Sequence, residues 1–274
     1  MKKLFTLILS AAFTTLQAQH KLTKLWETDT LAVPESVLPS IKDNFLYTSL
    51  INGGATDVDG NGSIAKVSLN GKIINANWVS GLNAPKGLGK WGNKLYVADL
   101  KEVVVINTVT GKIERKIPAG GSVFLNDIAV DNKGVVYVSD TRVGKVYRIR
   151  NNQAEVWLEN IADANGLKAI GNDLYILSGT KLIRVNQNKE IKTIAQGFAK
   201  NGDGVEQLKS GDFVVSCWNG LVYYVSASGK IELLLNTQDS KINTADIGLN
   251  SEKNIIYIPT FNHKSIIAYQ LSNK

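Results

Sequence analysis

Two acidic and two amide side chains stand at matching places in the sequence. Glu35, Asn126, Asn165 and Asp203 each begin a short segment that ends in an aliphatic residue. Six such segments align: ESV at 35–37, KGL at 86–88, NDI at 126–128, NGL at 165–167, DGV at 203–205 and ADI at 245–247. Carboxylate and amide oxygens are the ligands that calcium and magnesium prefer, and manganese also accepts them. A fold that gathers these segments would therefore create a cation site.

A second pattern indicates which fold this is. A turn followed by an aromatic or branched strand occurs six times, as FLYTS (45–49), KLYVAD (94–99), VVYVSD (135–140), DLYILSG (173–179), DFVVSCW (212–218) and IIYIPT (255–260). The repeat recurs about every 42 residues, and a period of about 40 to 45 residues built from short strands is typical of β-propellers. The sequence therefore predicts an all-β, six-bladed β-propeller. The six aligned segments would start the innermost strands and converge on the axis.

Each repeat unit resolves into four strands, except the last. That unit ends at IIAYQLSNK with three strands, while KLTKLWETD (21–29) precedes the first unit without a hairpin partner. Trp26 occupies the place that Trp78 and Trp157 hold in the outer strands of other units. We therefore expect the N-terminal strand to complete the last blade and remove its open edge.

The first residues have the layout of a secretory signal peptide. Two lysines precede a short apolar run and then small and polar residues, and we expect cleavage after Ala18. No cysteine follows the run to carry a lipid, and the run is too short to span a bilayer. The chain is thus predicted to be exported, periplasmic or secreted, without a membrane anchor. Residues 1–18 would be the signal peptide, and 19–274 a single propeller domain.

The charge of the chain indicates which partners it can bind, and its cysteine content indicates how the fold is stabilised. The net charge of +7 includes Lys2 and Lys3 and is spread without a dense basic run, which argues against nucleic acid. Cys217 is the only cysteine, so packing must stabilise the fold without an internal disulfide. We expect a monomer that binds a small-molecule substrate or ligand.

The ordered series of inner-strand segments resembles the senescence marker protein, gluconolactonase and luciferin-regenerating (regucalcin-like) family along the whole mature chain. The resemblance implies one divalent cation held by Glu35, Asn165 and Asp203, with calcium first and magnesium, manganese or zinc as alternatives. It implies that Asn126 lies beside the substrate and that Asp203 also serves as the general base. The family typically hydrolyses lactones or related esters, and the metal polarises the carbonyl.

Two positions depart from the family pattern. Members acting on sugar lactones are similar in having an arginine two residues before the Asn of the third inner strand, where this chain has Phe124. Lys86 is also expected in the funnel, where it would contact substrate or stabilise an oxyanion. The leading hypothesis is an exported metal-dependent hydrolase. The alternatives are a non-catalytic propeller that binds a small molecule or a partner protein around a structural metal, and a chain in which Lys86 replaces the cation.

Other polar motifs are assigned structural roles. Asp127 and Asp246 lie one residue beyond the aligned positions, where strand alternation turns side chains away from the axis. The loop DVDGNG (57–62) has the first spacings of an EF-hand but lacks its closing acid, so we interpret it as a surface turn. His20 and His263 are the only histidines, which disfavours a Ser-His-Asp hydrolase.

Overall fold

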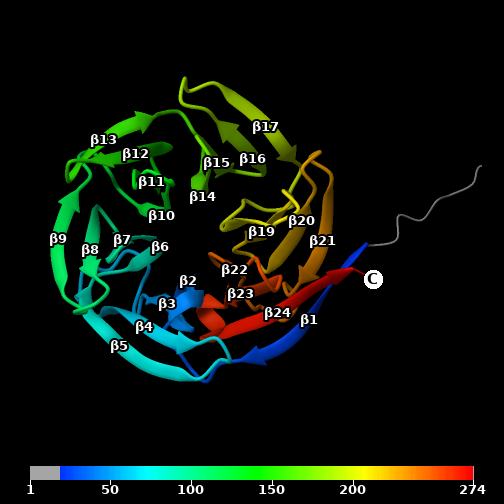
Figure 1. Ribbon diagram of the computed structural model, residues 1–274, viewed down its shortest axis with the longest axis horizontal. Coiled ribbons are helices and arrows are strands. Elements are labelled where there is room, and N and C mark those ends of the chain that lie inside the picture. The colour runs from blue at the N-terminus through cyan, green and yellow to red at the C-terminus, as the bar shows by residue number, and fades with distance from the viewer. Residues whose placement is uncertain (1–18, 274) are drawn as a thin grey trace, which may run out of the picture.

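The computed structural model describes residues 19–273 and confirms the six-bladed β-propeller. Six antiparallel sheets of four strands each are arranged in a ring around a central axis (Figure 1). The predicted signal peptide, residues 1–18, lies outside the described residues. No helix within residues 19–273 has the length and apolarity needed to span a membrane.

The blades follow one another in chain order, and each runs from its innermost strand outward. Blades one to three consist of β2 (Pro34–Ser40), β3 (Phe45–Leu50), β4 (Gly62–Ser68) and β5 (Ile73–Leu82); β6 (Pro85–Trp91), β7 (Lys94–Asp99), β8 (Glu102–Asn107) and β9 (Ile113–Pro118); and β10 (Leu125–Val130), β11 (Val136–Asp140), β12 (Lys145–Arg150) and β13 (Gln153–Leu158).

The remaining blades have the same order, with the last one closed by the first strand of the chain. They consist of β14 (Ala164–Ile170), β15 (Asp173–Ser178), β16 (Lys181–Val185) and β17 (Ile191–Gln196); β18 (Val205–Gln207), β19 (Phe213–Cys217), β20 (Leu221–Val225) and β21 (Ile231–Asn236); and β22 (Gly248–Asn250), β23 (Ile255–Pro259), β24 (Ile266–Asn273) and β1 (His20–Glu27). Two short 3-10 turns, η1 (Ile41–Asp43) and η2 (Phe261–His263), complete the description.

The strand register confirms the predicted alignment in all six blades. The second strand of every blade has a tyrosine or valine at the equivalent position of the repeat. This residue pairs with the inner-strand residue that lies three positions after the first residue of the aligned segment. The pairs are Tyr47 with Leu38, Tyr96 with Gly89, Tyr137 with Ala129, Tyr175 with Lys168, Val214 with Glu206 and Tyr257 with Gly248. The six aligned starts are therefore structurally equivalent, and they all lie at the same end of the blades.

The closure by the N-terminal strand is also confirmed. Strand β1 pairs with β24, and the Trp26 ring packs against Tyr257 of the same blade with 5.8 Å between ring centroids. The equivalent pairs in other blades are Tyr47 with Trp78 and Tyr137 with Trp157. In each of these three blades the tryptophan of the outer strand therefore packs against the tyrosine of the second strand.

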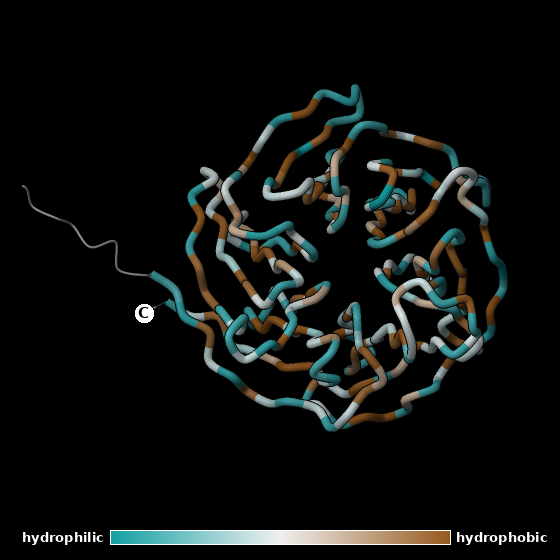
Figure 2. Tube along the Cα trace, turned by 180° about the vertical axis from the view of Figure 1, so that it is seen from behind, coloured by the Kyte–Doolittle hydropathy of each residue, from teal (hydrophilic) through white to brown (hydrophobic). Residues whose placement is uncertain are grey.

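Apolar side chains hold the blades together. Each of the six largest buried clusters contains residues from two neighbouring blades. Figure 2 shows the corresponding pattern, with hydrophobic stretches inside the blades and hydrophilic residues at many of the turns. Because all blade interfaces are packed in this way, the inner strands are held in fixed positions around the axis.

Candidate functional site

Bulges in the inner strands aim the candidate side chains. In blades one to four the ladder between the first and second strands shifts register at the aligned position, so that Glu35, Lys86, Asn126 and Asn165 each fall inside a bulge. Asp203 precedes β18 and is held by a hydrogen bond from its amide to the Ser216 carbonyl oxygen, 2.7 Å. A bulge re-aims a side chain that regular pairing would place elsewhere.

Serine hydroxyls accept backbone amides at the irregular starts of three inner strands. The amide of the residue after the aligned position donates to a serine on the second strand in three blades. These bonds run from Ser36 to Ser49, from Asp127 to Ser139 and from Gly204 to Ser216, each 2.9 Å long. Because a buried amide without a partner is costly, these serines stabilise the irregular backbone on which the site is built.

Glycine follows three of the aligned residues because neighbouring inner strands approach closely there. A Cβ on Gly166 would lie 2.3 Å from the carbonyl oxygen of Asp203, and a Cβ on Gly87 would lie 2.4 Å from the Cα of Asp127. At Gly204 the same atom would meet the amide of Ile247 at 2.5 Å. The glycines therefore allow the inner strands to bring their polar side chains together.

The three predicted metal ligands share an unusual feature, which is a buried oxygen without a hydrogen-bond partner. These atoms are Oε2 of Glu35, Oδ1 of Asn165 and Oδ2 of Asp203, three of only four such side-chain atoms within residues 19–273. The Asn165 amide donates to the other oxygen of Asp203 at 2.8 Å, which orients both side chains. Three unsatisfied oxygens from three blades fit a hard divalent cation, since such ions bind oxygen ligands.

Electrostatics support the same interpretation. Burial raises the pKa of Glu35 well above its ordinary value, and the charge of Asp203 raises it further. Burial also raises the pKa of Asp203 to about 7, although the bond from Asn165 opposes the shift. The two carboxyls therefore resist ionisation together in the absence of a positive charge. A cation between them would supply that charge.

The Lys86 ammonium is bound by backbone carbonyl oxygens and not by the acidic residues of the ring. No ion pair within the described chain joins it to Glu35 or Asp203. Its ammonium donates instead to the carbonyl oxygens of Ala55 at 3.0 Å and Ala84 at 2.8 Å. Burial lowers the pKa of Lys86 to about 8, and the negative charge of Glu35 opposes the shift. One ammonium hydrogen is left for a ligand, so the predicted contact with substrate depends on that hydrogen.

Asn126 lies in the ring as expected and is buried. Its amide donates to the Thr141 hydroxyl at 3.1 Å, and that hydroxyl donates to the carbonyl oxygen of Ala164 at 2.9 Å. Thr141 therefore connects the third and fourth blades and fixes the Asn126 amide. The orientation leaves the Asn126 carbonyl oxygen available on the ring.

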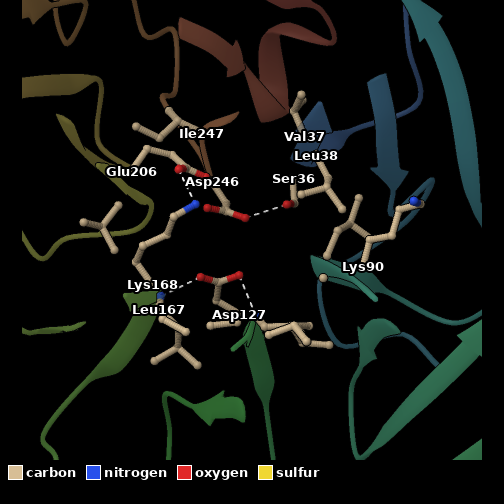
Figure 3. A pocket seen from close by; sticks show the side chains of 17 residues that line it. Ser36, Val37, Leu38, Lys90, Asp127, Leu167, Lys168, Glu206, Asp246 and Ile247 are labelled. Carbon is tan, nitrogen blue, oxygen red and sulfur yellow. Dashed lines mark hydrogen bonds and ion pairs between the residues drawn. The ribbon is translucent and has the colours of Figure 1, made fainter. Parts of the chain in front are cut away.

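Asp127 and Asp246 take the structural roles that were expected, but they face the axis. Asp127 accepts the amides of Ile128 and Leu167, each at 2.6 Å, and Asp246 accepts the Ser36 hydroxyl at 2.5 Å. Figure 3 shows both carboxylates at a cavity of about 170 Å³. Its lining consists of residues that come after the ring positions in the inner-strand segments. Expecting them to point away from the axis was wrong. Asp127 lies inside the bulge of β10, which interrupts strict alternation, and Asp246 precedes β22 and forms a bridge with Ser36 of the first blade.

Other candidate groups are engaged locally. Within residues 19–273 no three acidic, histidine or cysteine side chains converge as metal ligands, so the candidate site depends on an amide for its third oxygen. In the DVDGNG loop, Asp57 accepts the Gly54 amide at 2.7 Å and Asp59 accepts the Asn61 amide at 3.0 Å.

Both histidines lie on the periphery. His20, on the outermost strand β1, pairs with Glu232 at 2.9 Å. His263 is 3.1 Å from Glu27, the last residue of the same strand. Neither histidine is therefore placed to act together with the ring.

Comparisons with known proteins support the fold. No known family profile and no protein of curated function matches the chain. The structure is similar to a streptogramin B lyase, with 12% identity, 93% of this chain and 98% of that chain covered, and a TM-score of 0.67. It is also similar to selenomethionine-substituted virginiamycin B lyase from Staphylococcus aureus, with 15% identity, 92% and 99% covered, and a TM-score of 0.65.

A third similar structure is a catalytically inactive His-to-Ala variant of virginiamycin B lyase from Staphylococcus aureus with quinupristin. It has 17% identity, 92% and 99% coverage, and a TM-score of 0.62. At such identities the comparisons establish the propeller fold alone.

Sequence reasoning missed the contacts that surround Phe124. The Lys86 ammonium lies 4.4 Å from the centroid of the Phe124 ring, and the Arg142 guanidinium lies 4.5 Å from it. Arg142 lies in the connection between the second and third strands of its blade. Every unit has such a connection, so in the sequence only the charge of Arg142 set it apart. The Phe124 ring is thus in contact with two cationic side chains, those of Lys86 and Arg142.

Proposed function

We propose that this protein is an exported, metal-dependent hydrolase that acts on a lactone or a related ester. The observation that carries the proposal is the set of three unpartnered buried oxygens on Glu35, Asn165 and Asp203. A divalent cation bound there would polarise the ester carbonyl and stabilise the charge that develops on its oxygen.

The chain's own residues supply the remaining chemistry. Asp203 would accept the proton of the attacking water through a lone pair of Oδ2 that is not directed at the cation, because Oδ1 already accepts the Asn165 amide. A cation bound beside this carboxyl would favour its ionised form, which is the form that a general base needs. The water oxygen bonds to the carbonyl carbon, the ester C–O bond breaks, and the proton passes to the leaving alkoxide.

Asn126 and Lys86 border the reacting group. The Asn126 carbonyl oxygen is free to accept a substrate hydroxyl, since Thr141 holds the amide. The remaining hydrogen of the Lys86 ammonium can donate to a substrate oxygen, and a pKa of about 8 keeps this group mainly protonated at pH 7. Residues 1–18 are proposed to direct export, which places the activity in the periplasm or outside the cell.

The test is turnover of a lactone panel by the purified protein with calcium, magnesium, manganese or zinc, and with a chelator. In oxygen-labelled water a hydrolase incorporates one solvent oxygen into the product, whereas a lyase incorporates none. We expect metal-dependent incorporation. Cleavage without incorporation would contradict the hydrolase, and thermal stabilisation by metal without any turnover would favour a binding propeller.

A further inference from the structure

A cavity of about 490 Å³ opens beside the candidate site, on the face where the inner strands begin. Its walls come from the loop between β3 and β4 and from the connections β5–β6, β7–β8, β9–β10 and β11–β12. Successive strands are antiparallel, so all these connections lie at the same end of their blades. The cavity is therefore accessible to a ligand that also reaches the ring.

The acidic groups in this cavity already have partners. Asp99 accepts the amides of Asn83 at 2.9 Å and Ala84 at 2.8 Å. Glu102 pairs with Lys116 at 2.8 Å. Neither carboxylate is therefore available to neutralise the cations that line the same space.

Arg142 lines the cavity and has no acidic partner within residues 19–273. Its guanidinium lies over the Phe124 ring at 4.5 Å, which positions the planar group without using its hydrogen-bond donors. The donors of this fork match the two oxygens of a carboxylate.

One buried side chain holds this arrangement in place. The Asp140 carboxylate accepts the amides of Val123 at 2.6 Å and Phe124 at 3.1 Å through one oxygen. Its other oxygen accepts the amides of Arg142 at 3.1 Å and Val143 at 3.3 Å. The ring and the guanidinium are thus anchored by the same residue, which reduces the cost of ordering them when a ligand binds.

The cavity connects to the candidate site through Lys86. The Lys86 ammonium contacts the same Phe124 ring at 4.4 Å and binds the carbonyl oxygen of Ala55, the residue before the cavity-lining Thr56. Val58 and Val123 add exposed apolar surface to the walls. A ligand that extends from the ring toward Arg142 would therefore pass along an apolar wall.

We propose that Arg142 is a specificity-determining residue that binds a carboxylate on the substrate, so that the preferred ester or lactone is a monoanion with a hydrocarbon portion. This inference rests on the proposed function for the reacting group. A monoanion fits better than a phosphate dianion, because the Asp99 and Glu102 carboxylates line the same cavity.

The test uses γ-carboxy-γ-butyrolactone and its carboxamide as matched substrates, with the non-hydrolysable pair tetrahydrofuroate and tetrahydrofuramide as binding probes. The proteins are wild type, Arg142→Gln, and Arg115→Gln, which removes one exposed positive charge from β9. NMR titrations give the affinities of the probes in the presence of calcium. Thermal unfolding verifies that the variants are folded.

We expect wild type and Arg115→Gln to prefer the carboxylate in both pairs. In Arg142→Gln the affinity for tetrahydrofuroate and the carboxylate-to-carboxamide ratio of kcat/KM should each fall by about 10- to 100-fold, as for loss of a charged hydrogen-bonded pair. Equal binding of tetrahydrofuroate to wild type and Arg142→Gln, or no binding to wild type, would overturn the inference.

The two proposals fail separately. Arg142-dependent binding of tetrahydrofuroate without turnover of either lactone would support this subsite and contradict the hydrolase. Turnover of both lactones at a ratio that Arg142→Gln leaves unchanged would support the hydrolase and overturn the subsite.

Discussion

The charge of Asp203 leads to opposite predictions for stability and for metal binding. Burial raises the pKa of this carboxyl from an ordinary value of 3.8 to about 7. Ionising it at pH 8 in the folded, metal-free protein therefore costs on the order of 4 kcal/mol relative to the unfolded chain. Asp203→Asn removes this charge and keeps an acceptor for the Asn165 amide.

We expect Asp203→Asn to stabilise the metal-free protein at pH 8 by roughly 1 to 3 kcal/mol, because proton uptake by neighbouring carboxyls already offsets part of the cost. For a domain of this size the rise in Tm would be about 3 to 10 °C. Calcium at one hundred times its Kd should stabilise the wild type by about 2.7 kcal/mol. It should leave Asp203→Asn unchanged.

The assay is thermal unfolding at pH 8, first in chelator and then across a calcium titration. The matched control is Asp246→Asn, since burial also raises the pKa of Asp246 well above its ordinary value but its carboxylate binds the Ser36 hydroxyl. We expect the control to gain stability in chelator and to keep the response to calcium. A destabilised Asp203→Asn that still responds to calcium would refute the reasoning.

Three further predictions follow from the same site. Gly166→Ala places a Cβ 2.3 Å from the Asp203 carbonyl oxygen, so calorimetry should show a loss of about 1 to 3 kcal/mol and weaker calcium binding, whereas unchanged binding would contradict the close approach. In chelator the wild-type Tm should fall as pH rises from about 4 to about 8, because Asp203 binds more protons folded than unfolded, and saturating calcium should reduce the decline; a Tm that rises with pH in chelator would contradict the raised pKa of Asp203. Lys86→Met removes a positive charge near Glu35, so calcium affinity should increase about 3- to 10-fold in calorimetry while lactone turnover decreases, and weaker calcium binding would argue against this account.

The repeat made the fold and the alignment of the ring predictable. In five of the six blades a tyrosine occupies the same position of the second strand: Tyr47, Tyr96, Tyr137, Tyr175 and Tyr257. The inner-strand residue that pairs with each tyrosine lies three positions after the ring residue of that blade. A regular register carries such information along the chain, so distant residues such as Glu35 and Asp203 could be placed at one axis from the sequence alone.

Contacts made by irregular segments could not be predicted in the same way. Lys86 binds the Ala55 carbonyl oxygen in a loop that only the first blade contains, so no other repeat indicates its path. The contact between Arg142 and Phe124 joins the β9–β10 and β11–β12 connections, and the buried Asp140 carboxylate holds both of them. The inward direction of Asp127 depends on the bulge in β10, and Asp246 lies before β22, so strict alternation along a strand does not anticipate either direction.

The account depends on a cation bound by oxygens from three blades, and an anomalous-scattering map of crystals soaked with manganese tests this most directly. We predict one peak on the axis, about 2.0 to 2.6 Å from Oε2 of Glu35, Oδ1 of Asn165 and Oδ2 of Asp203. The peak should be absent from crystals of Asp203→Asn. A map without density among these three atoms, or with equal density in the variant, would contradict the metal site.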